Sequence, residues 1–388
     1  MNLKFWDRNK LKKFKERNFL IALVLGVVIG SFIFFLLNYY PVNKNIVFGV
    51  TFSKKYAEEL GLDWQKAYLE ILDDLQVKKI RLPVYWDDVE REIGRYSWEP
   101  YDWMIAEAEK RNVKLIVALG VKLPRWPECH IPLWATEEQR NTETEEQKNK
   151  EIPKPRRTVG AGTPVPRLQA GMAAGGLATE GLGAEKQRNE IEDLFLPFLR
   201  DAILRYRNYN SVESWQIENE PYFFREFGVC PEIREEFLIK EFDLAKQIGG
   251  RAVMSTESGE MGNWEQMINK VDILGISLYR VTWNKWVGYL FYPLTPIFYR
   301  EKIRVLRPFF EDIVLSELQV EPWSFKKITE MPLDEQFKTM NLRQLKSNID
   351  FSRRIGADEV YLWGVEWWYY MKNLGHDEFW REGEELFK

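Results

Sequence analysis

The hydrophobic pattern of this chain alternates between short, continuous apolar runs and longer runs with helical spacing. The runs at 46–52, 79–85 and 114–120 are continuously apolar, as buried parallel strands are. The segments 63–75 and 101–111 instead place apolar residues every three or four positions, which is typical of amphipathic helices. The first part of the chain is therefore predicted to alternate strands with helices.

The same alternation continues to the C-terminus. Five further strands are predicted at 212–217, 251–255, 271–279, 312–317 and 359–365. Helices are predicted at 191–206, 233–248, 264–269, 297–306, 334–355 and 377–387. Eight strands, each followed by a helical pattern, predict an α/β fold of the (β/α)8 TIM-barrel type. An open doubly wound sheet would alternate in the same way, but the sequence after the first strand lacks its glycine-rich phosphate motif.

One segment interrupts this pattern. Residues 136–186 contain charged runs, and 159–185 are rich in Gly and Ala without an apolar period. Such composition is typical of loops and not of a packed core. We therefore expect a flexible insertion within a single barrel domain that spans 39–388.

The N-terminus predicts a membrane anchor. Residues 1–18 carry seven basic and two acidic side chains, and residues 19–37 carry no charge. A helix of that length rises about 28 Å, close to the thickness of a hydrocarbon core. The basic flank predicts a cytoplasmic segment at 1–18, an anchor at 19–38 and an extracytoplasmic domain, which places the protein in the cell membrane as a single-pass protein. A cleaved signal peptide is the alternative, but no small-residue cleavage site follows the apolar run.

Composition narrows the class of ligand. Aromatic residues make up 15% of the chain, with 16 Trp, which suits flat ligands such as sugar rings, although a large core also uses Trp. The net charge of -4 gives no indication of a nucleic-acid partner. The two histidines, His130 and His376, are too few for a histidine-based metal site, so no metal or other cofactor is expected.

Polar residues collect where the predicted strands end, which is where barrel enzymes carry their chemistry. The fourth strand ends in Asn219-Glu220-Pro221 and the seventh in Glu317. The other strand ends supply carboxylates, a guanidinium and aromatic rings: Arg81, Trp86, Trp126, Glu257, Tyr279 and Trp363. Two carboxylates beside aromatic platforms are what glycoside hydrolysis needs.

This set of residues resembles the retaining (β/α)8 glycoside hydrolases of the cellulase-like clan, clan A, and looks most like glycoside hydrolase family 5. In that clan an Asn-Glu pair closes strand four and a second Glu closes strand seven. Asn219-Glu220-Pro221 and Ser316-Glu317-Leu318 match these two elements. Family 5 commonly has a His-x-Tyr on strand six, where this chain has Ser277-Leu278-Tyr279. The resemblance is therefore to the clan more than to the family.

The resemblance implies that Glu220 is the acid/base and Glu317 the nucleophile of a double displacement on a β-linked oligo- or polysaccharide, and that Asn219 bonds the sugar 2-hydroxyl. It also extends to Arg81, Tyr279 and Trp363. We further expect Arg81 and Tyr279 to hold Glu317, with the floor of the barrel as the alternative place for Arg81. Trp86, Trp126, Trp363 and Glu257 are the candidates for substrate contact, with the core as the alternative for Trp126 and a salt bridge as the alternative for Glu257. Glu321 is the alternative nucleophile, and a transglycosylase or a non-catalytic glycan-binding barrel are the alternative functions.

Two further expectations concern the loops. Cys129 and Cys230 follow strands three and four, whose loops are neighbours at one rim, so a disulfide is predicted outside the cytoplasm. The apolar stretch 286–298 is expected to pack on the barrel, with a substrate groove or the membrane as alternative contacts.

Overall fold

The computed structural model describes residues 8–38, 42–136, 177–223, 230, 232–284, 286–323 and 326–388. Most of the predicted insertion, residues 137–176, lies outside the described residues. Its last part, from Leu177, belongs to a helix that runs to Tyr206 and so begins before the predicted start at residue 191.

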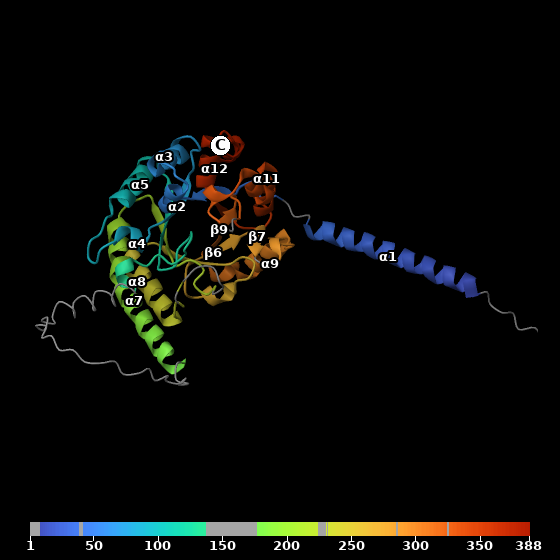
Figure 1. Ribbon diagram of the computed structural model, residues 1–388, viewed down its shortest axis with the longest axis horizontal. Helices are drawn as coiled ribbons and strands as arrows, with labels where there is room; N and C mark the ends of the chain where they lie inside the picture. The colour runs from blue at the N-terminus through green and yellow to red at the C-terminus, as the bar shows by residue number, and fades with distance from the viewer. Residues whose placement is uncertain are drawn as a thin grey trace, which may run out of the picture.

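Eight parallel strands form a closed barrel, which lies among the helices in Figure 1. Their order around the barrel is β1-β10-β9-β6-β5-β4-β3-β2. They span Val47–Thr51 (β1), Lys79–Pro83 (β2), Lys114–Leu119 (β3), Val212–Ile217 (β4), Ala252–Glu257 (β5), Ile273–Leu278 (β6), Asp312–Gln319 (β9) and Glu359–Trp363 (β10). All eight overlap the predicted strands, and the TIM-barrel prediction is confirmed.

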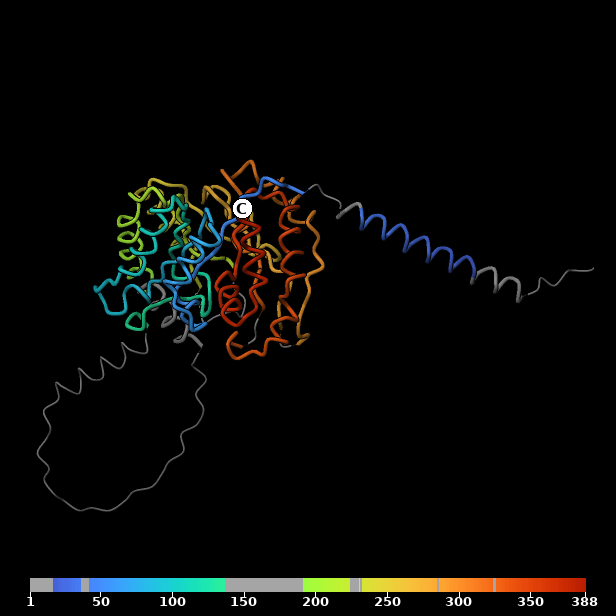
Figure 2. The backbone as a smooth tube through the Cα atoms, turned by 90° about the horizontal axis from the view of Figure 1, so that it is seen from above, coloured from blue at the N-terminus to red at the C-terminus, as the bar shows by residue number. Residues whose placement is uncertain are grey.

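Helices surround this barrel, and their ring is seen from above in Figure 2. They span Lys54–Glu59 (α2), Trp64–Asp73 (α3), Trp86–Val89 (α4), Glu99–Lys110 (α5), Leu177–Tyr206 (α7), Glu235–Gly249 (α8), Pro296–Leu306 (α9), Leu333–Thr339 (α10), Leu342–Ser352 (α11), Val365–Asn373 (α12) and Glu378–Phe387 (α13). Local capping sets their starts. The Asp63 side chain, for example, accepts from the amides of Gln65 and Lys66 and so begins α3.

The single helix predicted at 334–355 is wrong, because the structure has two helices there, α10 and α11. Met340 and Asn341 are extended between them. The Asn341 side chain accepts from the Gln344 amide at 3.0 Å and caps α11. A capping asparagine inside an apolar period ends one helix and begins the next, which the hydrophobic pattern alone does not reveal.

The apolar stretch after β6 forms a two-stranded antiparallel ribbon, Val281–Asn284 (β7) and Gly288–Phe291 (β8). Trp286 at its turn is 81% exposed and Phe291 is exposed too, so the packing expectation is wrong for these residues. Phe298, further along, does pack against the core. The ribbon pairs its own backbone groups and therefore needs no neighbour to cover them.

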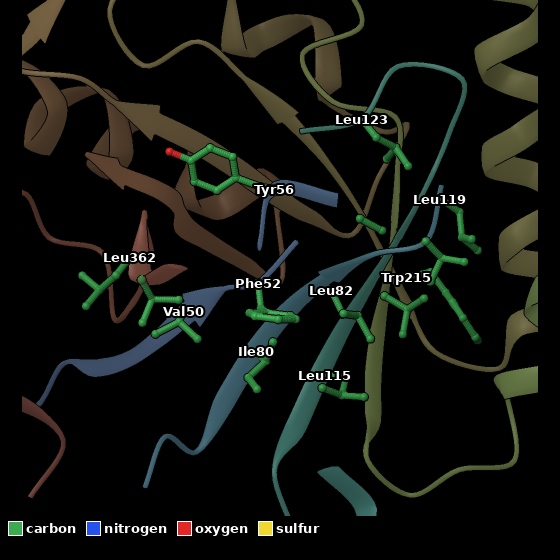
Figure 3. Packing of buried hydrophobic residues seen from close by; sticks show 14 of the residues in the cluster. Val50, Phe52, Tyr56, Ile80, Leu82, Leu115, Leu119, Leu123, Trp215 and Leu362 are labelled. Atoms are coloured by element: carbon green, nitrogen blue, oxygen red, sulfur yellow. The ribbon is translucent and has the colours of Figure 1, made fainter. Parts of the chain in front are cut away.

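Two apolar clusters hold the barrel together. The larger one fills the space between strands and helices, and Figure 3 shows part of it, with Phe52, Leu82, Leu119 and Trp215 among the labelled residues. A separate cluster consists of Ile116, Met254, Val314 and Tyr361, which lie on four different barrel strands. Side chains alternate between the two faces of a strand, so Ile116 points into the barrel while its neighbours Leu115 and Val117 join the outer core.

The N-terminal helix α1 spans Arg8–Asn38 and extends away from the barrel (Figure 1). Within it, Arg17–Phe35 has a mean hydropathy of 2.5, none of it is buried, and it is long and apolar enough to cross a membrane. The chain enters the barrel through Asn43, whose amide donates to the Arg353 carbonyl at 2.8 Å, just before β1. The N-terminal helix therefore joins the barrel at the end where its strands begin.

Candidate active site

The end of β4 presents Asn219 and Glu220 through an unusual backbone. Glu218 and Glu220 have φ of 58° and 46°, a left-handed conformation that residues with a side chain rarely adopt. Two contacts hold it: the Asn219 amide donates to the Lys122 carbonyl at 2.8 Å, and the Glu220 amide to Thr256 Oγ1 at 2.9 Å. Strained backbone held from both neighbouring strands is typical of functional sites.

Glu317 lies at an irregularity in β9. Ile276 of β6 pairs with Leu315, but the next residue, Ser277, pairs with Glu317, so Ser316 is an extra residue on β9. Such a bulge changes the direction of the side chains that follow it. The Glu317 carboxylate accepts from Arg81 Nη1 at 2.8 Å and from the Tyr279 hydroxyl at 2.7 Å. The two residues expected to hold Glu317 therefore contact its carboxylate.

Arg81 connects the two strand ends inside the barrel. Its Nη2 donates to Asn219 Oδ1 at 2.7 Å, and its Nε donates to Gln216 Oε1 at 2.6 Å. The side chain is completely buried. A buried guanidinium with this many acceptors is well satisfied and fixes the positions of the groups it binds. The structure therefore brings Arg81, Asn219, Tyr279 and Glu317 into one network.

Glu220 lies beside this network. Ser277 Oγ donates to its Oε1 at 2.7 Å. Burial raises the pKa of Glu220 to about 8, and the negative charge of Glu317 raises it as well. Lys122 and the Ser277 hydrogen bond act in the opposite direction. A carboxyl group that keeps its proton at neutral pH next to an arginine-paired carboxylate is the division of roles that acid catalysis with a nucleophile requires.

Lys122 and Glu128, in the loop after β3, also enter the site, although their place in the sequence predicts no role for them. The buried Lys122 ammonium donates to the carbonyls of Glu220 and Phe223 at 3.0 and 3.1 Å. It lies 3.6 Å from the carboxylate of Glu128, whose pKa is raised by burial and, to a smaller degree, by Glu317. The only hint of Lys122 in the sequence was a lysine in the loop that follows an apolar strand. A solvent-exposed loop would also contain such a lysine.

Glu218 is a buried carboxyl group that holds the backbone next to the site. Its carboxylate accepts from the backbone amides of Val121 and Lys122 at 2.6 and 2.7 Å, and so ties the loop after β3 to the end of β4. A Cβ at Gly120 would lie 2.8 Å from the Glu218 carboxyl carbon, so only glycine fits there. Burial raises the pKa of Glu218 to about 7, and burial together with the nearby Glu218 raises the pKa of Glu241 of α8 well above its usual value.

Two carboxyl groups lie at the end of β5 and just after it: Glu257 is buried and Glu260 is partly exposed. Glu257 Oε1 has no hydrogen-bond partner among the described residues, and burial together with the charge of Glu220 raises the Glu257 pKa to about 8. Glu260 accepts from the Tyr279 amide and the Tyr299 hydroxyl, both at 2.8 Å. Glu260 therefore helps to position Tyr279, and Glu257 places a second carboxyl group with a raised pKa near Glu220.

The candidate aromatic platforms differ in position. Trp86 is fully buried, packs against Trp134 and Phe195, and donates to Glu90, so it belongs to the core under the helices and does not join the network around Glu317. Trp126 is 69% exposed in the loop after β3. Trp363 lies at the end of β10, where a guanidinium covers one of its faces.

That guanidinium belongs to Arg125. Its central carbon lies 3.9 Å from the centre of the Trp363 ring and 3.7 Å from that of Tyr56. It forms ion pairs with Glu321 and with Glu366, the latter at 3.0 Å. Glu321, the alternative nucleophile, is thus engaged by Arg125, while Glu317 is the carboxylate that Arg81 and Tyr279 hold.

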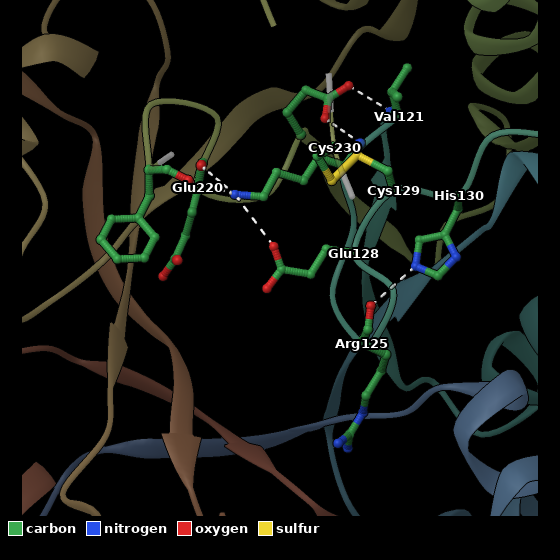
Figure 4. The surroundings of a disulfide bond; sticks show 10 residues. Val121, Arg125, Glu128, Cys129, His130, Glu220 and Cys230 are labelled. Atoms are coloured by element: carbon green, nitrogen blue, oxygen red, sulfur yellow. Dashed lines mark hydrogen bonds and ion pairs between the residues drawn. A yellow bond between two sulfur atoms is a disulfide. The ribbon is translucent and has the colours of Figure 1, made fainter. Parts of the chain in front are cut away.

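A disulfide joins Cys129 and Cys230, with Cα atoms 5.3 Å apart (Figure 4). It links the loop after β3 to the loop after β4. The same β3 loop carries Lys122, Arg125 and Glu128. The bond therefore constrains the segment that delivers these three side chains to the site. Across the described residues, no group of three or more His, Cys, Asp or Glu is arranged to hold a metal ion.

Comparison with protein-family models finds no match, and comparison with curated proteins finds none either. Solved structures do match. A beta-glucosidase from Exiguobacterium marinum is 14% identical, with a TM-score of 0.44, over 86% of this chain and 99% of its own.

Two further solved structures are similar at comparable levels. A family 1 beta-glucosidase from Thermotoga maritima is 10% identical over 84% of this chain and 88% of its own, with a TM-score of 0.47. A family 5 glycosidase from Bifidobacterium longum, solved with Manβ1-4GlcNAc, is 10% identical over 82% and 68%, with a TM-score of 0.47. At these identities the likeness concerns the fold and carries no information on the substrate.

Proposed function

We propose that the protein is a retaining glycoside hydrolase that cleaves β-linked glycans. One observation carries the proposal: Glu220 at the end of β4 has a raised pKa and lies near Glu317 of β9, whose carboxylate accepts hydrogen bonds from Arg81 and Tyr279. Asn219 completes the set, because Arg81 fixes its side-chain oxygen and leaves its amide group to donate to a sugar hydroxyl.

The first step transfers the sugar to the protein. Glu317 Oε attacks the anomeric carbon and the glycosidic bond breaks, while Glu220 gives its proton to the departing oxygen. The products are a glycosyl ester on Glu317 and the leaving alcohol. Arg81 and Tyr279 favour Glu317 as the attacking group, because their hydrogen bonds hold its side chain in place.

The second step returns the protein to its starting state. The ester carries no negative charge, so one of the influences that raised the Glu220 pKa is gone and Glu220 holds its proton less tightly. The Glu220 carboxylate can then take a proton from water as the water oxygen attacks the anomeric carbon. The ester bond to Glu317 breaks, and the sugar leaves with its original configuration.

Aryl β-glycosides of several common sugars test this function. Release of the aryl alcohol, with retention of configuration in the first sugar product, is the expected result. An inverted product would contradict the double displacement. Absence of turnover on every glycoside, by a protein that is shown to be folded, would contradict the enzymatic function and favour a glycan-binding barrel.

We also propose that α1 anchors the protein in the membrane as a single-pass helix. Its apolar segment has the length that a bilayer needs, and Asn43 holds the start of the barrel close behind it. The strand ends with Glu220 and Glu317 lie at the opposite end of the barrel, which would face away from the bilayer. Extraction of membranes at alkaline pH tests the anchor: an intact chain that stays in the pellet is expected, and a soluble chain lacking residues 1–38 would show a cleaved signal.

A further inference from the structure

A buried wall covers the barrel mouth above β1, β2 and β10. Its residues come from the segments after β1, β2, β3, β9 and β10 and are joined by hydrogen bonds. The Tyr85 hydroxyl donates to the Pro124 carbonyl at 2.9 Å and lies 2.8 Å from Ser53 Oγ. The Ser53 amide donates to Glu366 Oε1 at 2.6 Å, and Arg125 Nη2 donates to the second oxygen of Glu366 at 3.0 Å.

Arg125 is the centre of this wall. Its side chain is 7% exposed and lies against the rings of Tyr56 and Trp363. Its two terminal nitrogens bind Glu321 and Glu366, which come from the segments after β9 and β10. Removing the guanidinium from this place would leave Glu366 buried without its counter-charge, which proteins disfavour strongly. The wall is therefore a stable part of the site.

The position of the wall relative to the catalytic pair follows from the order of the strands. In the eight-stranded ring, β1 lies opposite β5, β10 opposite β4, and β2 opposite β6. Glu220 leaves β4 and is held by Thr256 of β5 and Ser277 of β6. Since the acid stands over the departing oxygen, the leaving group lies on the β4–β6 side. The sugar attacked by Glu317 extends toward the wall.

We infer that this wall ends the substrate site one sugar beyond the cleaved bond, so that the enzyme removes single sugars from the non-reducing ends of β-linked chains. A second sugar on that side would need the face of Trp363, and Arg125 occupies it. This inference rests on the proposed glycosidase function and adds to it the class of substrate: a chain end with one terminal residue, and not the interior of a polysaccharide.

The first product released from matched substrates tests the inference. The probes are p-nitrophenyl β-glycosides of glucose, galactose, mannose and xylose, and the p-nitrophenyl β-1,4-disaccharide of whichever sugar is accepted. The wild-type enzyme is expected to release p-nitrophenol at once from the monosaccharide glycoside. From the disaccharide glycoside it should release the terminal sugar first, and p-nitrophenol only after a lag.

The Arg125→Ala variant is expected to shorten or abolish that lag, because the freed face of Trp363 can then accept the second sugar. Arg95→Ala is the matched control, since Arg95 is an exposed arginine whose partner is Glu92 and which lies outside the wall. The wild-type measurement is sufficient if Arg125→Ala does not fold. Free disaccharide as the first wild-type product would overturn the inference and leave the glycosidase function intact. Inactivity on all the glycosides would defeat the proposed function itself.

Discussion

Arg81 donates to Glu317 Oε1 at 2.8 Å and through its other terminal nitrogen to Asn219 Oδ1 at 2.7 Å. One buried guanidinium thus sets the distance between the strand end that carries the candidate nucleophile and the strand end that carries the candidate acid. Because the guanidinium is planar and rigid, a change on one strand is transmitted to the other.

Replacement of the nucleophile should abolish turnover. Glu317→Gln keeps the size of the side chain but cannot attack the anomeric carbon, so we expect kcat to fall by about 10⁴-fold or more. Glu301→Gln, an exposed surface change, is the control. Mass spectrometry after reaction with an activated 2-fluoro-glycoside should find the sugar on the peptide that contains Glu317. A label on Glu321 would assign the nucleophile to the other carboxylate.

Replacement of the acid should depend on the leaving group. For Glu220→Ala we expect a loss of roughly 10²–10⁴-fold with poor leaving groups, the usual range for general acid catalysis. With dinitrophenyl glycosides the first step needs no proton, so the loss in kcat/KM should be much smaller. Added azide should then speed turnover and give a glycosyl azide of retained configuration. An equal loss with all leaving groups would argue against this role.

The pH profile should depend on Lys122. Glu220 must be protonated to act, so kcat/KM should fall as the pH rises through the raised pKa of Glu220. The positive charge of Lys122 lowers that pKa, and its removal should raise it. Lys122→Met should therefore move the alkaline limb to higher pH, while Lys122→Arg should leave the limb in place. A loss of activity without a shift of the limb would show that Lys122 serves only to hold the loop.

Stability should fall between acidic and mildly alkaline pH. The pKa of Glu257 rises to about 8 in the folded protein, so folding favours its protonated form. That contribution is fully present below the pKa of the unfolded chain and is lost as the pH rises through the folded value. Glu257→Gln should make the fall in Tm with pH less steep. The number of protons that the chain takes up on folding in this pH range should decrease by about one. Glu265→Gln changes an exposed carboxylate and should leave the slope of Tm against pH unchanged. Equal slopes for the wild type and both variants would contradict the raised pKa of Glu257.

Reduction of the disulfide should affect both stability and activity. The bond closes a loop with a sequence separation of 101 residues. For loops of that size the chain-entropy estimate is about 4–5 kcal/mol, so Cys129→Ala should lower the unfolding free energy by an amount of that order. Intact-mass measurement should show two alkylated thiols only after reduction. Alkylation of the untreated protein would show that the bond does not form.

The sequence by itself determined the barrel and located Glu220 and Glu317, the proposed catalytic pair, because both depend on local patterns along the chain. A buried parallel strand must be apolar along its length, and a polar residue becomes possible only where the strand ends. The apolar run up to Ile217 therefore located Asn219 and Glu220, and the run up to Leu315 located Glu317. The start of α7 and the break at Asn341 were misjudged, because a hydrophobic period does not register caps.

Only the tertiary structure decided what surrounds that pair. Arg125 binds Glu366, 241 residues away in the chain, and no local pattern connects them. The path of the loop after β3 depends on left-handed backbone at Arg125 and Glu128 and on the disulfide to Cys230, and this path brings Lys122 and Arg125 to the site. The burial of Trp86 also depends on contacts between distant segments, because Phe195 of α7 packs against its ring. Contacts between distant segments depend on three-dimensional packing, which acts on shape and charge and leaves no periodic signal in the sequence.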